Sequence, residues 1–436
     1  MKALLWVLVI FVQIHEYKSC LEEERIGLLH LKSFLKSIPY TNSNYLLPSW
    51  VDNSKSIECC GWERVRCNST TSHIIELSLE NLKQDPYYGE HNYEKVNFGD
   101  RWLLNVSMLK PFKELRSLDI SFNAIGGWIP YEGFEKLSSL RNLEILNLGY
   151  NFFHDNGILQ SLGDVTSLKT LNLTRNLLEG YFPAQELVGL KNLNKLDISG
   201  NSYNDIIPSQ GFERLVVLRN LETLNLNYND FDDSIIPSLS ELTSLTTLSL
   251  AFNRLGERVT IEGWKSLSRL ENLEKIDLSH NHLNDDPLQS LVAVKTLKDL
   301  NLASNQVTGS FLAKDWKLLS GLENLEILDL SYNCLNHNAL QSLAVVKSLK
   351  NLNLAGNQLT ETFPTRGWES LSRLEKLEIL DLSFNYIING SCLSSLTTIK
   401  SLKYLNLAGN NMTFFPVKGK RGEVGSTGFH NGFQGG

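Results

Sequence analysis

The residues of this sequence that could do chemistry are few and scattered. His280 and His282 form an H-x-H pair that could ligate a metal, but no third ligand lies in register with them. Asp230, Asp232 and Asp233 resemble part of a calcium loop, yet the glycine and the distant glutamate of an EF-hand are missing, so we interpret them as a solvated turn. The sequence contains no G-x-S-x-G, H-E-x-x-H or phosphate-binding loop motif. We therefore expect a non-enzyme without a catalytic, cofactor or metal site.

The cysteines predict disulfide chemistry near the N-terminus. Four of the six lie in the first segment, at Cys20, Cys59, Cys60 and Cys67. Three connectivities are open, and we favour Cys20 with Cys59 and Cys60 with Cys67, because adjacent cysteines rarely bridge each other. Zinc is the rival interpretation, but no histidine stands at finger spacing. The remaining two cysteines, Cys334 and Cys392, lie far from the others, and we expect both to be free and buried.

A repeated pattern dictates the elements that must position all other side chains. The motif L-x-x-L-x-L-x-x-N recurs twelve times at intervals of 24 to 28 residues, which is typical of leucine-rich repeats. Its closing residues are Asn123, Asn151, Asn176, Asn201, Asn229, Asn253, Asn281, Asn305, Asn333, Asn357, Asn385 and Asn410. Each L-x-L should form a short strand with leucines inward, and each Asn should bond unpaired backbone groups inside the coil. The fold class is an α/β-type repeat solenoid: a right-handed superhelix with a parallel β-sheet on its concave face and an N-terminal disulfide-bonded cap.

The chain divides into five segments. Residues 1–19 carry a lysine and a short apolar run, which predicts a signal peptide and a secretory route. A cap with the first strand follows at 20–83, then a polar and aromatic insertion and lead-in at 84–114. The twelve repeats occupy 115–415, and a Gly-rich tail that we expect to be disordered occupies 416–436.

From Asn225 on, the repeats alternate strictly between 28 and 24 residues, so the true unit becomes 52 residues. In the long turns, an aromatic residue stands nine positions before the next strand's leading leucine. We expect these aromatic side chains to lie in the core: Phe134, Phe212, Trp264, Trp316 and Trp368.

Two columns of side chains should line the concave face, because strand residues alternate between faces and successive turns align. The column between the two strand leucines, from Asp119 to Asn406, is Asp or Asn in eleven of twelve turns, which favours a scaffold role. The column directly before the repeat Asn varies from turn to turn and is rich in aromatic residues, which favours recognition of a protein or peptide. Its candidate binding residues are Tyr150, Arg175, Tyr228, Phe252, His280, Tyr332 and Phe384; the alternative is that the rings merely cover strand ends.

The net charge and the glycosylation sequons limit the classes of partner that the chain could bind. The net charge of -7 gives no basic footprint for nucleic acid or anionic membrane, which leaves extracellular peptides, proteins or glycans. The secretory interpretation agrees with five N-x-S/T sequons, at Asn68, Asn105, Asn172, Asn389 and Asn411. A glycan on Asn172 would project from the concave face and shift binding toward the C-terminal turns or the flanks.

Four segments carry a family resemblance: CLEEERIGLLHLK from Cys20, PSW at Pro48 to Trp50, CCGWERVRC, and RWLLNVSMLKPFKELRSLDIS. With these motifs the chain resembles the extracellular part of plant leucine-rich-repeat receptor-like proteins, of the immune and parasite-sensing branch. The resemblance implies a plasma-membrane protein with one transmembrane helix that recognises a peptide or microbial molecule and signals through partner receptor kinases.

The chain departs from that family in several places. The plant-type G-x-I-P segment is clear once, at Gly127 to Pro130, and the island segment, C-terminal cap and apolar membrane helix are missing. We expect a C-terminally truncated gene product or splice form, at the cell surface by resemblance, or secreted into the extracellular space if the short form is genuine. The alternative function is a secreted decoy, or an inhibitor of a cell-wall-degrading enzyme.

Overall fold

The computed structural model describes residues 20–38, 46–52, 58–82, 101–129, 134–206, 216–257, 261–308, 316–360, 366–388 and 392–411. The chain forms two compact units. Unit 1 comprises Met1–Arg254 with Arg269–Leu273, and unit 2 comprises Leu255–Ser268 with Glu274–Gly436. The expected signal peptide at 1–19, the stretch 83–100, the tail from 412 onward, Phe212 and Asn389 lie outside the described residues.

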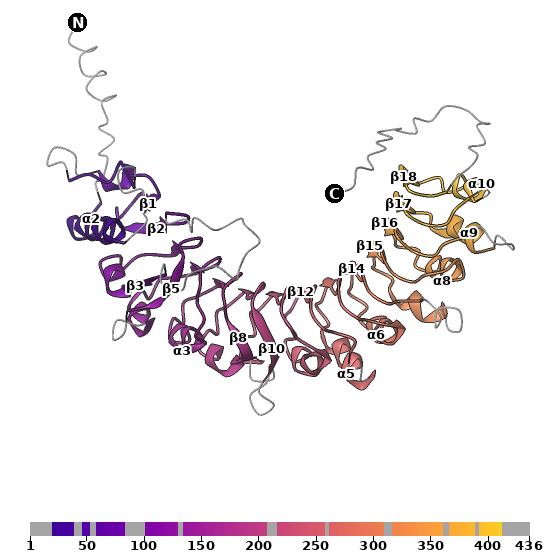
Figure 1. Ribbon diagram of the computed structural model, residues 1–436, viewed down its shortest axis with the longest axis horizontal. Coiled ribbons are helices and arrows are strands. Elements are labelled where there is room, and N and C mark those ends of the chain that lie inside the picture. Colours follow the sequence, from indigo (N-terminus) through magenta and orange to yellow (C-terminus); the bar gives the residue numbers. More distant parts are fainter. Residues whose placement is uncertain are drawn as a thin grey trace, which may run out of the picture. The chain divides into compact units, whose positions relative to one another are not determined.

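Unit 1 begins with helix α2 (Glu22–Ser37), which covers the end of the coil (Figure 1). Three glutamates in its first turn and Lys36 in its last turn complement the helix dipole. Leu28, Leu31 and Leu35 form its buried stripe at helical spacing. The predicted helical stretch from Leu21 to Ile38 is therefore the cap helix.

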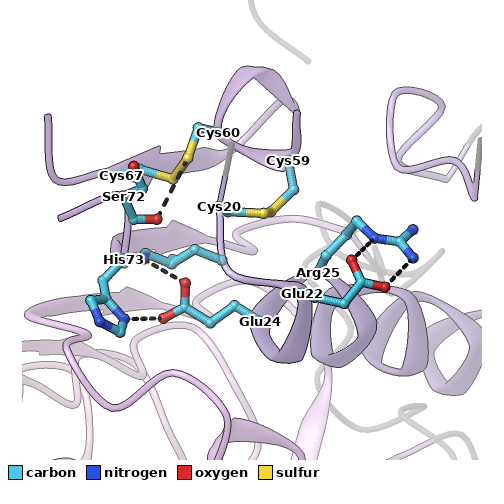
Figure 2. Close-up of a disulfide and its surroundings, with 10 residues drawn as sticks. Cys20, Glu22, Glu24, Arg25, Cys59, Cys60, Cys67, Ser72 and His73 are labelled. Atoms are coloured by element: carbon cyan, nitrogen blue, oxygen red, sulfur yellow. Dashed lines mark hydrogen bonds and ion pairs between the residues drawn. A yellow bond between two sulfur atoms is a disulfide. The ribbon is translucent and has the colours of Figure 1, made fainter. Parts of the chain in front are cut away.

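Both predicted disulfides are present beside this helix, Cys20–Cys59 and Cys60–Cys67 (Figure 2). The short helix η1 (Cys59–Gly61) presents the two adjacent cysteines to different partners. Strand β1 (Val65–Cys67) then pairs antiparallel with β2 (Ile74–Ser78), the first strand of the coil. The sequence predicted β2 but not this antiparallel hairpin.

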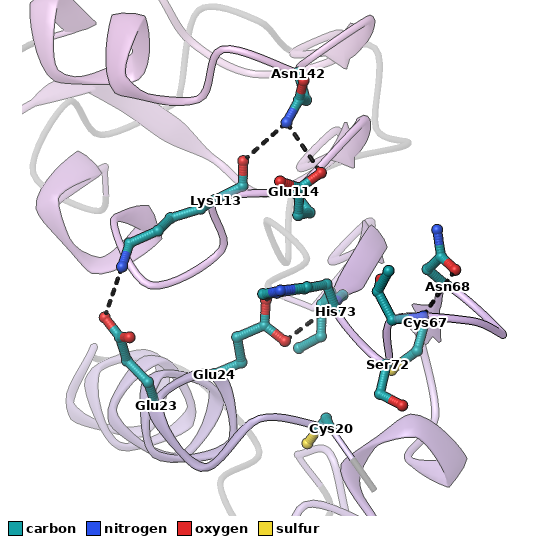
Figure 3. A network of polar contacts seen from close by, with 12 residues as sticks. Cys20, Glu23, Glu24, Cys67, Asn68, Ser72, His73, Lys113, Glu114 and Asn142 are labelled. Carbon is teal, nitrogen blue, oxygen red and sulfur yellow. Dashed lines mark hydrogen bonds and ion pairs between the residues drawn. The ribbon is translucent and has the colours of Figure 1, made fainter. Parts of the chain in front are cut away.

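A side-chain network ties the cap to the first turns (Figure 3). The buried carboxylate of Glu24 accepts the N–H of Ile74 at 3.0 Å and lies 3.1 Å from Nδ1 of His73. Lys113 forms an ion pair with Glu23 at 3.5 Å. Helix α2 is thus attached to strand β2 by a buried hydrogen bond and to the segment before β4 by an exposed ion pair.

The sheet of unit 1 is parallel from β2 onward, and the middle leucine of each strand lies opposite the middle leucine of the next. Its strands after β2 are β4 (Ser117–Asp119), β6 (Ile145–Asn147), β7 (Thr170–Asn172), β9 (Lys195–Asp197), β11 (Thr223–Asn225) and β12 (Thr247–Ser249). The central leucines are fully buried, and such burial contributes about 1.5–3 kcal/mol per side chain.

Unit 2 has the same design by itself: its sheet is parallel, and the middle residue of each strand lies opposite the middle residue of the next. Its strands are β13 (Lys275–Asp277), β14 (Asp299–Asn301), β15 (Ile327–Asp329), β16 (Asn351–Asn353), β17 (Ile379–Asp381) and β18 (Tyr404–Asn406). Within each unit the strands form one side of the coil and short helices the other (Figure 1). The predicted repeat solenoid is therefore confirmed.

The helical turns opposite the sheets are short. In unit 1 they are η4 (Val106–Leu109), η5 (Phe134–Ser139), α3 (Gly157–Leu162), η6 (Ala184–Leu187), η8 (Asp233–Ile235) and α4 (Ile236–Leu239). From Ile261 on they are α5 (Ile261–Lys265), η9 (Ser266–Arg269), α6 (Asp285–Leu291), η10 (Trp316–Gly321), α8 (Ala339–Leu343), α9 (Arg366–Ser370), η11 (Leu371–Arg373) and α10 (Leu393–Leu396). Trp264 and Trp368 are buried among them, which confirms the core prediction for these two rings.

Two small parallel sheets lie outside the main ladder. Strand β3 (Trp102–Leu104) pairs with β5 (Ile125–Trp128), and β8 (Glu179–Phe182) pairs with β10 (Ser202–Ile206). Strand β5 contains the first two residues of the G-x-I-P segment, Gly127 and Trp128, which the sequence identified as a motif but not as a strand. Residues 101–114 of the lead-in also belong to the coil, since Leu104, Val106 and Leu109 are buried.

The repeat asparagines link neighbouring turns, as predicted, and all of them except Asn410 are buried inside the coil. Asn333 is representative: its Nδ2 donates to the carbonyls of Leu302 and Leu330, and its Oδ1 accepts the N–H of Val307. Each described asparagine of the series satisfies backbone groups that the tight turn leaves without a helix or sheet partner.

The two remaining cysteines are free, and Cys392 is buried at the repeat position of the buried Leu340. Cys334 is only half-buried, so the expectation that both are buried is wrong for Cys334. It directly follows the repeat asparagine, where the chain leaves the strand face and the core no longer covers it. Among the residues that the structure describes, no helix combines the length and apolar content needed to cross a bilayer.

Candidate functional site

The strongest candidate site is the column directly before the repeat asparagines, which we call the pre-asparagine column. All twelve of its residues have positive φ: Phe122, Tyr150, Arg175, Gly200, Tyr228, Phe252, His280, Ser304, Tyr332, Gly356, Phe384 and Gly409. In this left-handed region glycine fits without cost, whereas other residues are disfavoured. Nine of the twelve positions nevertheless carry a side chain, and seven of these carry a ring.

Backbone hydrogen bonds fix this conformation. The N–H of Tyr332 donates to the carbonyl of Ala355 in the next turn, and that of Phe384 donates to Ala408. Because the following asparagine points into the core, the residue before it points outward. The turn thus holds each ring on the solvent side of the sheet.

In unit 1 the large side chains of neighbouring turns contact each other. The rings of Phe122 and Tyr150 stack at a centroid distance of 4.0 Å, and the guanidinium of Arg175 lies 5.7 Å from the Tyr150 ring. The rings of Tyr228 and Phe252 stack in the same way at 4.1 Å. Unit 1 therefore presents two stacked clusters on its strand face, with half of the Tyr228 side chain (49%) still exposed.

In unit 2 a small residue follows each ring of the column, and after Tyr332 and Phe384 it is glycine. A Cβ atom on Gly356 would lie 2.6 Å from the Tyr332 ring, and a Cβ on Gly409 would lie 2.5 Å from the Phe384 ring. Each ring thus lies against the bare backbone of the next turn. Tyr332 and Phe384 are also among the most exposed aromatic side chains of the described residues, at 58% and 60%.

The Asp/Asn column forms a hydrogen-bond ladder along the sheet. Asn353 donates to Asp329 at 2.8 Å and Asn406 donates to Asp381 at 2.9 Å. The other oxygen of each aspartate accepts from the serine two residues on, such as Ser331 and Ser383. Asn147 and Asn225 make the same bond in unit 1, to Asp119 and Asp197. These contacts agree with the scaffold role expected for this column.

A third column on the strand face was missed by the sequence reasoning. It consists of the first residue of each strand, and Ile145, Ile327, Ile379 and Tyr404 are exposed in it. Strand alternation places this position on the same face as the Asp/Asn column, so the signal was available. Two of the three isoleucines, Ile327 and Ile379, lie on the strands that precede Tyr332 and Phe384.

Ion pairs border the strand face in unit 2. They join Glu274 to Lys298, Glu326 to Lys350, and Glu378 to Lys403, at 2.7 or 2.8 Å. The bond from Lys350 lowers the pKa of the Glu326 carboxyl. Because these pairs cancel, the aspartates of the neighbouring ladder carry the net charge of this surface.

Three described sequons share one geometry. The Oδ1 atoms of Asn68, Asn105 and Asn172 accept the backbone N–H of the sequon's own Thr70, Ser107 and Thr174. Asn172 belongs to the Asp/Asn column, but the turn before it carries Asn147 instead of an aspartate. Asn411 is exposed at the end of the described residues.

The scattered metal candidates do not form a centre. Within the described ranges, no three His, Cys, Asp or Glu side chains gather as metal ligands. His282 lies 3.9 Å from Glu257. Asp232 caps η8 through the N–H of Ser234, and Asp233 is buried, so the interpretation of this stretch as a fully solvated turn is wrong for Asp233. The aspartates begin a helical turn, which the calcium comparison did not consider.

Comparisons with known proteins agree with the repeat fold. A family model described as leucine-rich repeat region matches residues 101–368, and one described as leucine rich repeat N-terminal domain matches residues 21–68. Receptor like protein 21 of Arabidopsis thaliana is 33% identical over 312 residues, which cover 70% of this chain and 22% of that protein. Cuscuta receptor 1 of Solanum lycopersicum is 31% identical over 490 residues, which cover 93% of this chain and 37% of that protein.

The chain thus spans less than two fifths of the length of either curated relative. Among solved structures, a leucine-rich-repeat protein of Leptospira interrogans superposes with a TM-score of 0.59 at 24% identity, covering 73% of this chain and 72% of that one. At this identity the likeness shows the shared fold alone.

Proposed function

Because the chain belongs to the plant leucine-rich-repeat receptor-like proteins, we propose that it is a non-catalytic extracellular recognition module whose strand face binds a peptide or a microbe- or parasite-derived molecule. The residues proposed to contact the ligand are Tyr150, Arg175, Tyr228, Phe252, His280, Tyr332 and Phe384.

One observation carries this proposal. Large side chains occupy left-handed positions where glycine costs nothing, and four of their rings are exposed instead of buried, from 37% for Phe252 to 60% for Phe384. A ring in such a place contributes little to the core, and exposed aromatic side chains are the commonest anchors of protein interfaces. Binding a partner would bury these rings.

The consequence of binding is also proposed from the family. Receptor-like proteins recognise a ligand outside the cell, and the name of the tomato relative describes a receptor for Cuscuta. We propose the extracellular side of the plasma membrane as the site of action, with receptor kinases as the partners that relay binding in defence or development.

Binding can be tested without knowing the natural ligand. A random twelve-residue peptide display library is selected against the purified chain, and the affinities of the selected peptides are measured for the Tyr228→Ala, Phe252→Ala, Tyr332→Ala triple variant. We expect a loss of about a hundredfold or more, because three ring contacts of about 1 kcal/mol or more each are removed.

The matched control is the double variant Tyr181→Ala, Tyr386→Ala. These tyrosines are as exposed as the column rings, at 54% and 56%, but lie outside the pre-asparagine column. Unchanged affinity in the triple variant, with both proteins folded, would refute the aromatic column as the binding site.

We further propose that Asn172 carries an N-linked glycan, and that in the glycosylated protein the ligand contacts the rings from Tyr228 onward instead of Tyr150 and Arg175. Asn147 and Asn225 in the same column use Nδ2 to bind an aspartate of the preceding turn, whereas the turn before Asn172 offers no aspartate. A glycan on Nδ2 of Asn172 therefore breaks no bond of the ladder.

The glycan is tested on protein secreted from plant cells. Enzymatic deglycosylation in ¹⁸O-water followed by trypsin should give the peptide of residues 170–175 with a labelled aspartate at position 172. An engineered sequon, Ala355→Thr, is the comparison, because a glycan on Asn353 would break its bond to Asp329 and should lower the melting temperature. Recovery of peptide 170–175 without label would contradict the proposal.

A further inference from the structure

The strand face of unit 2 repeats its chemistry on every second turn. The pre-asparagine column alternates a ring with a small residue, and the rings are His280, Tyr332 and Phe384, separated by Ser304 and Gly356. The same three turns contribute the aspartates of the Asp/Asn column: Asp277, Asp329 and Asp381. The 52-residue double repeat thus presents one ring and one carboxylate per period.

Glycine keeps the rings of this series apart. Where neighbouring turns both carry rings, as with Tyr228 and Phe252, the rings close onto each other at 4.1 Å. Tyr332 and Phe384 have Gly356 between them, and each ring packs against glycine backbone with more than half of its surface exposed. The two rings therefore stand separately, two strands apart, with open surface for a ligand.

The distance between the rings selects the shape of the ligand. Neighbouring strands lie about 4.8 Å apart, so equivalent atoms two strands apart are separated by about 9.6 Å. A polyproline II helix returns to the same face every three residues, which is about 9.3 Å. A β-strand presents the same face every two residues, about 6.8 Å, and fits this spacing poorly.

Charge selects the composition of the ligand. The four ion pairs bordering unit 2, including that between Lys275 and Asp299, leave the ladder aspartates as the net charge of the face. Asp329 accepts a hydrogen bond from the N–H of Ser331, the residue next to Tyr332. Asp381 likewise accepts from the N–H of Ser383, the residue next to Phe384. A cation placed there would meet a carboxylate and an aromatic ring together.

We propose that the strand face of unit 2 binds a basic, proline-rich segment in the polyproline II conformation, lying across the strands. Successive turns of that helix contact Tyr332 and Phe384, and its Lys or Arg side chains face Asp277, Asp329 and Asp381. Aromatic side chains with open spaces between them are the general means of recognising such helices. The inference rests on the proposed function and names the class of ligand.

The test uses three synthetic twelve-residue peptides and fluorescence anisotropy with the purified chain. The first contains four Lys-Pro-Pro triplets. The second contains three Lys-Pro-Pro-Pro quartets, which break the three-residue period, and the third contains four Lys-Gly-Gly triplets, which keep the charge but not the helix. We expect the first to bind about tenfold tighter than either control.

Variants locate the contact. Tyr332→Ala and Phe384→Ala should each weaken binding of the Lys-Pro-Pro peptide about tenfold, whereas Tyr386→Ala should leave it unchanged. Asp277→Asn, which keeps an acceptor for Ser279, should weaken binding and reduce its dependence on salt.

Two outcomes overturn the inference: equal binding of the three peptides, or no binding of the Lys-Pro-Pro peptide. Neither outcome contradicts the proposed function. That proposal fails only if library-selected peptides bind the Tyr228→Ala, Phe252→Ala, Tyr332→Ala triple variant as tightly as the unmodified chain.

Discussion

Residues of the pre-asparagine column combine a left-handed backbone with large side chains, although large side chains usually disfavour that backbone. The turn at the end of each strand needs a left-handed backbone, and Gly200, Gly356 and Gly409 supply it without strain. Tyr332 and Phe384 adopt the same conformation with large exposed side chains. The sequence revealed the variability of this column, but not its φ angles, because only the placed backbone shows that all twelve turns bend in one way.

A substitution series at Tyr332 tests this strain. Tyr332→Gly should give a higher free energy of unfolding than Tyr332→Ala, by about 1–2 kcal/mol, because glycine relieves the left-handed backbone. At Tyr404, in strand β18, the order should reverse by about 0.5–1 kcal/mol, since glycine weakens a strand. Urea titration of the four variants measures both differences. If the Gly and Ala variants rank in the same order of stability at both sites, the backbone at Tyr332 is not strained.

The repeat asparagines are predicted to be the most sensitive polar residues. Asn333→Ala removes the donors to Leu302 and Leu330 and the acceptor for Val307, and leaves these buried groups unpaired. We expect a loss of about 3 kcal/mol or more in the free energy of unfolding. Asn338→Ala, at an exposed asparagine of the same turn, should change it by less than about 0.5 kcal/mol. Similar losses of stability from both substitutions would contradict the structural role of the repeat asparagines.

At the scale of elements, the sequence predicts the strands that recur with the repeat and misses the strands that do not. The leucines and asparagines predict the strands of both main sheets, and of the three possible cysteine pairings the favoured one is the pairing that the structure contains. The strands of the two small sheets are short and irregular in sequence, with register shifts in both. Their pairing depends on which turns stack, which no local pattern records. The same holds for the β1–β2 hairpin.

The cap helix carries a pH-dependent contact. Burial raises the pKa of the Glu24 carboxyl, because desolvation outweighs the hydrogen bonds from Ile74 and His73. A carboxyl with a raised folded-state pKa contributes stability that is fully present below its ordinary pKa and is lost as pH rises through the raised value. The cap should therefore be more stable, relative to a Glu24→Gln variant, at about pH 4 than at about pH 7.

Hydrogen exchange of the segments 22–37 and 74–78 measures this difference. Groups that titrate elsewhere affect both proteins equally, so their contribution cancels in the comparison. A difference between the unmodified chain and the Glu24→Gln variant that stays constant from about pH 7 to about pH 4 would show that burial does not control this carboxyl.

At the scale of the whole molecule, each unit keeps the positions that hold the coil together distinct from the positions that we propose for recognition. Leucines, tryptophans and asparagines hold the turns together, and the Asp/Asn ladder aligns the strands. The side chains left over are the rings before the asparagines and the exposed isoleucines at the strand starts. The sequence was sufficient to separate core from surface, because buried positions repeat. It could not rank the surface positions, since stacking of Tyr228 on Phe252 and separation of Tyr332 from Phe384 depend on neighbouring turns.

The account stands on the claim that ligands bury the pre-asparagine rings. Hydroxyl-radical footprinting of the chain with and without a library-selected peptide tests it most directly, with oxidation of each ring quantified by mass spectrometry. We predict protection of at least two rings among Tyr228, Phe252, Tyr332 and Phe384, and unchanged oxidation of Tyr181 and Tyr386. Protection of Tyr181 or Tyr386, with the four column rings oxidised as in the free protein, would contradict the claim.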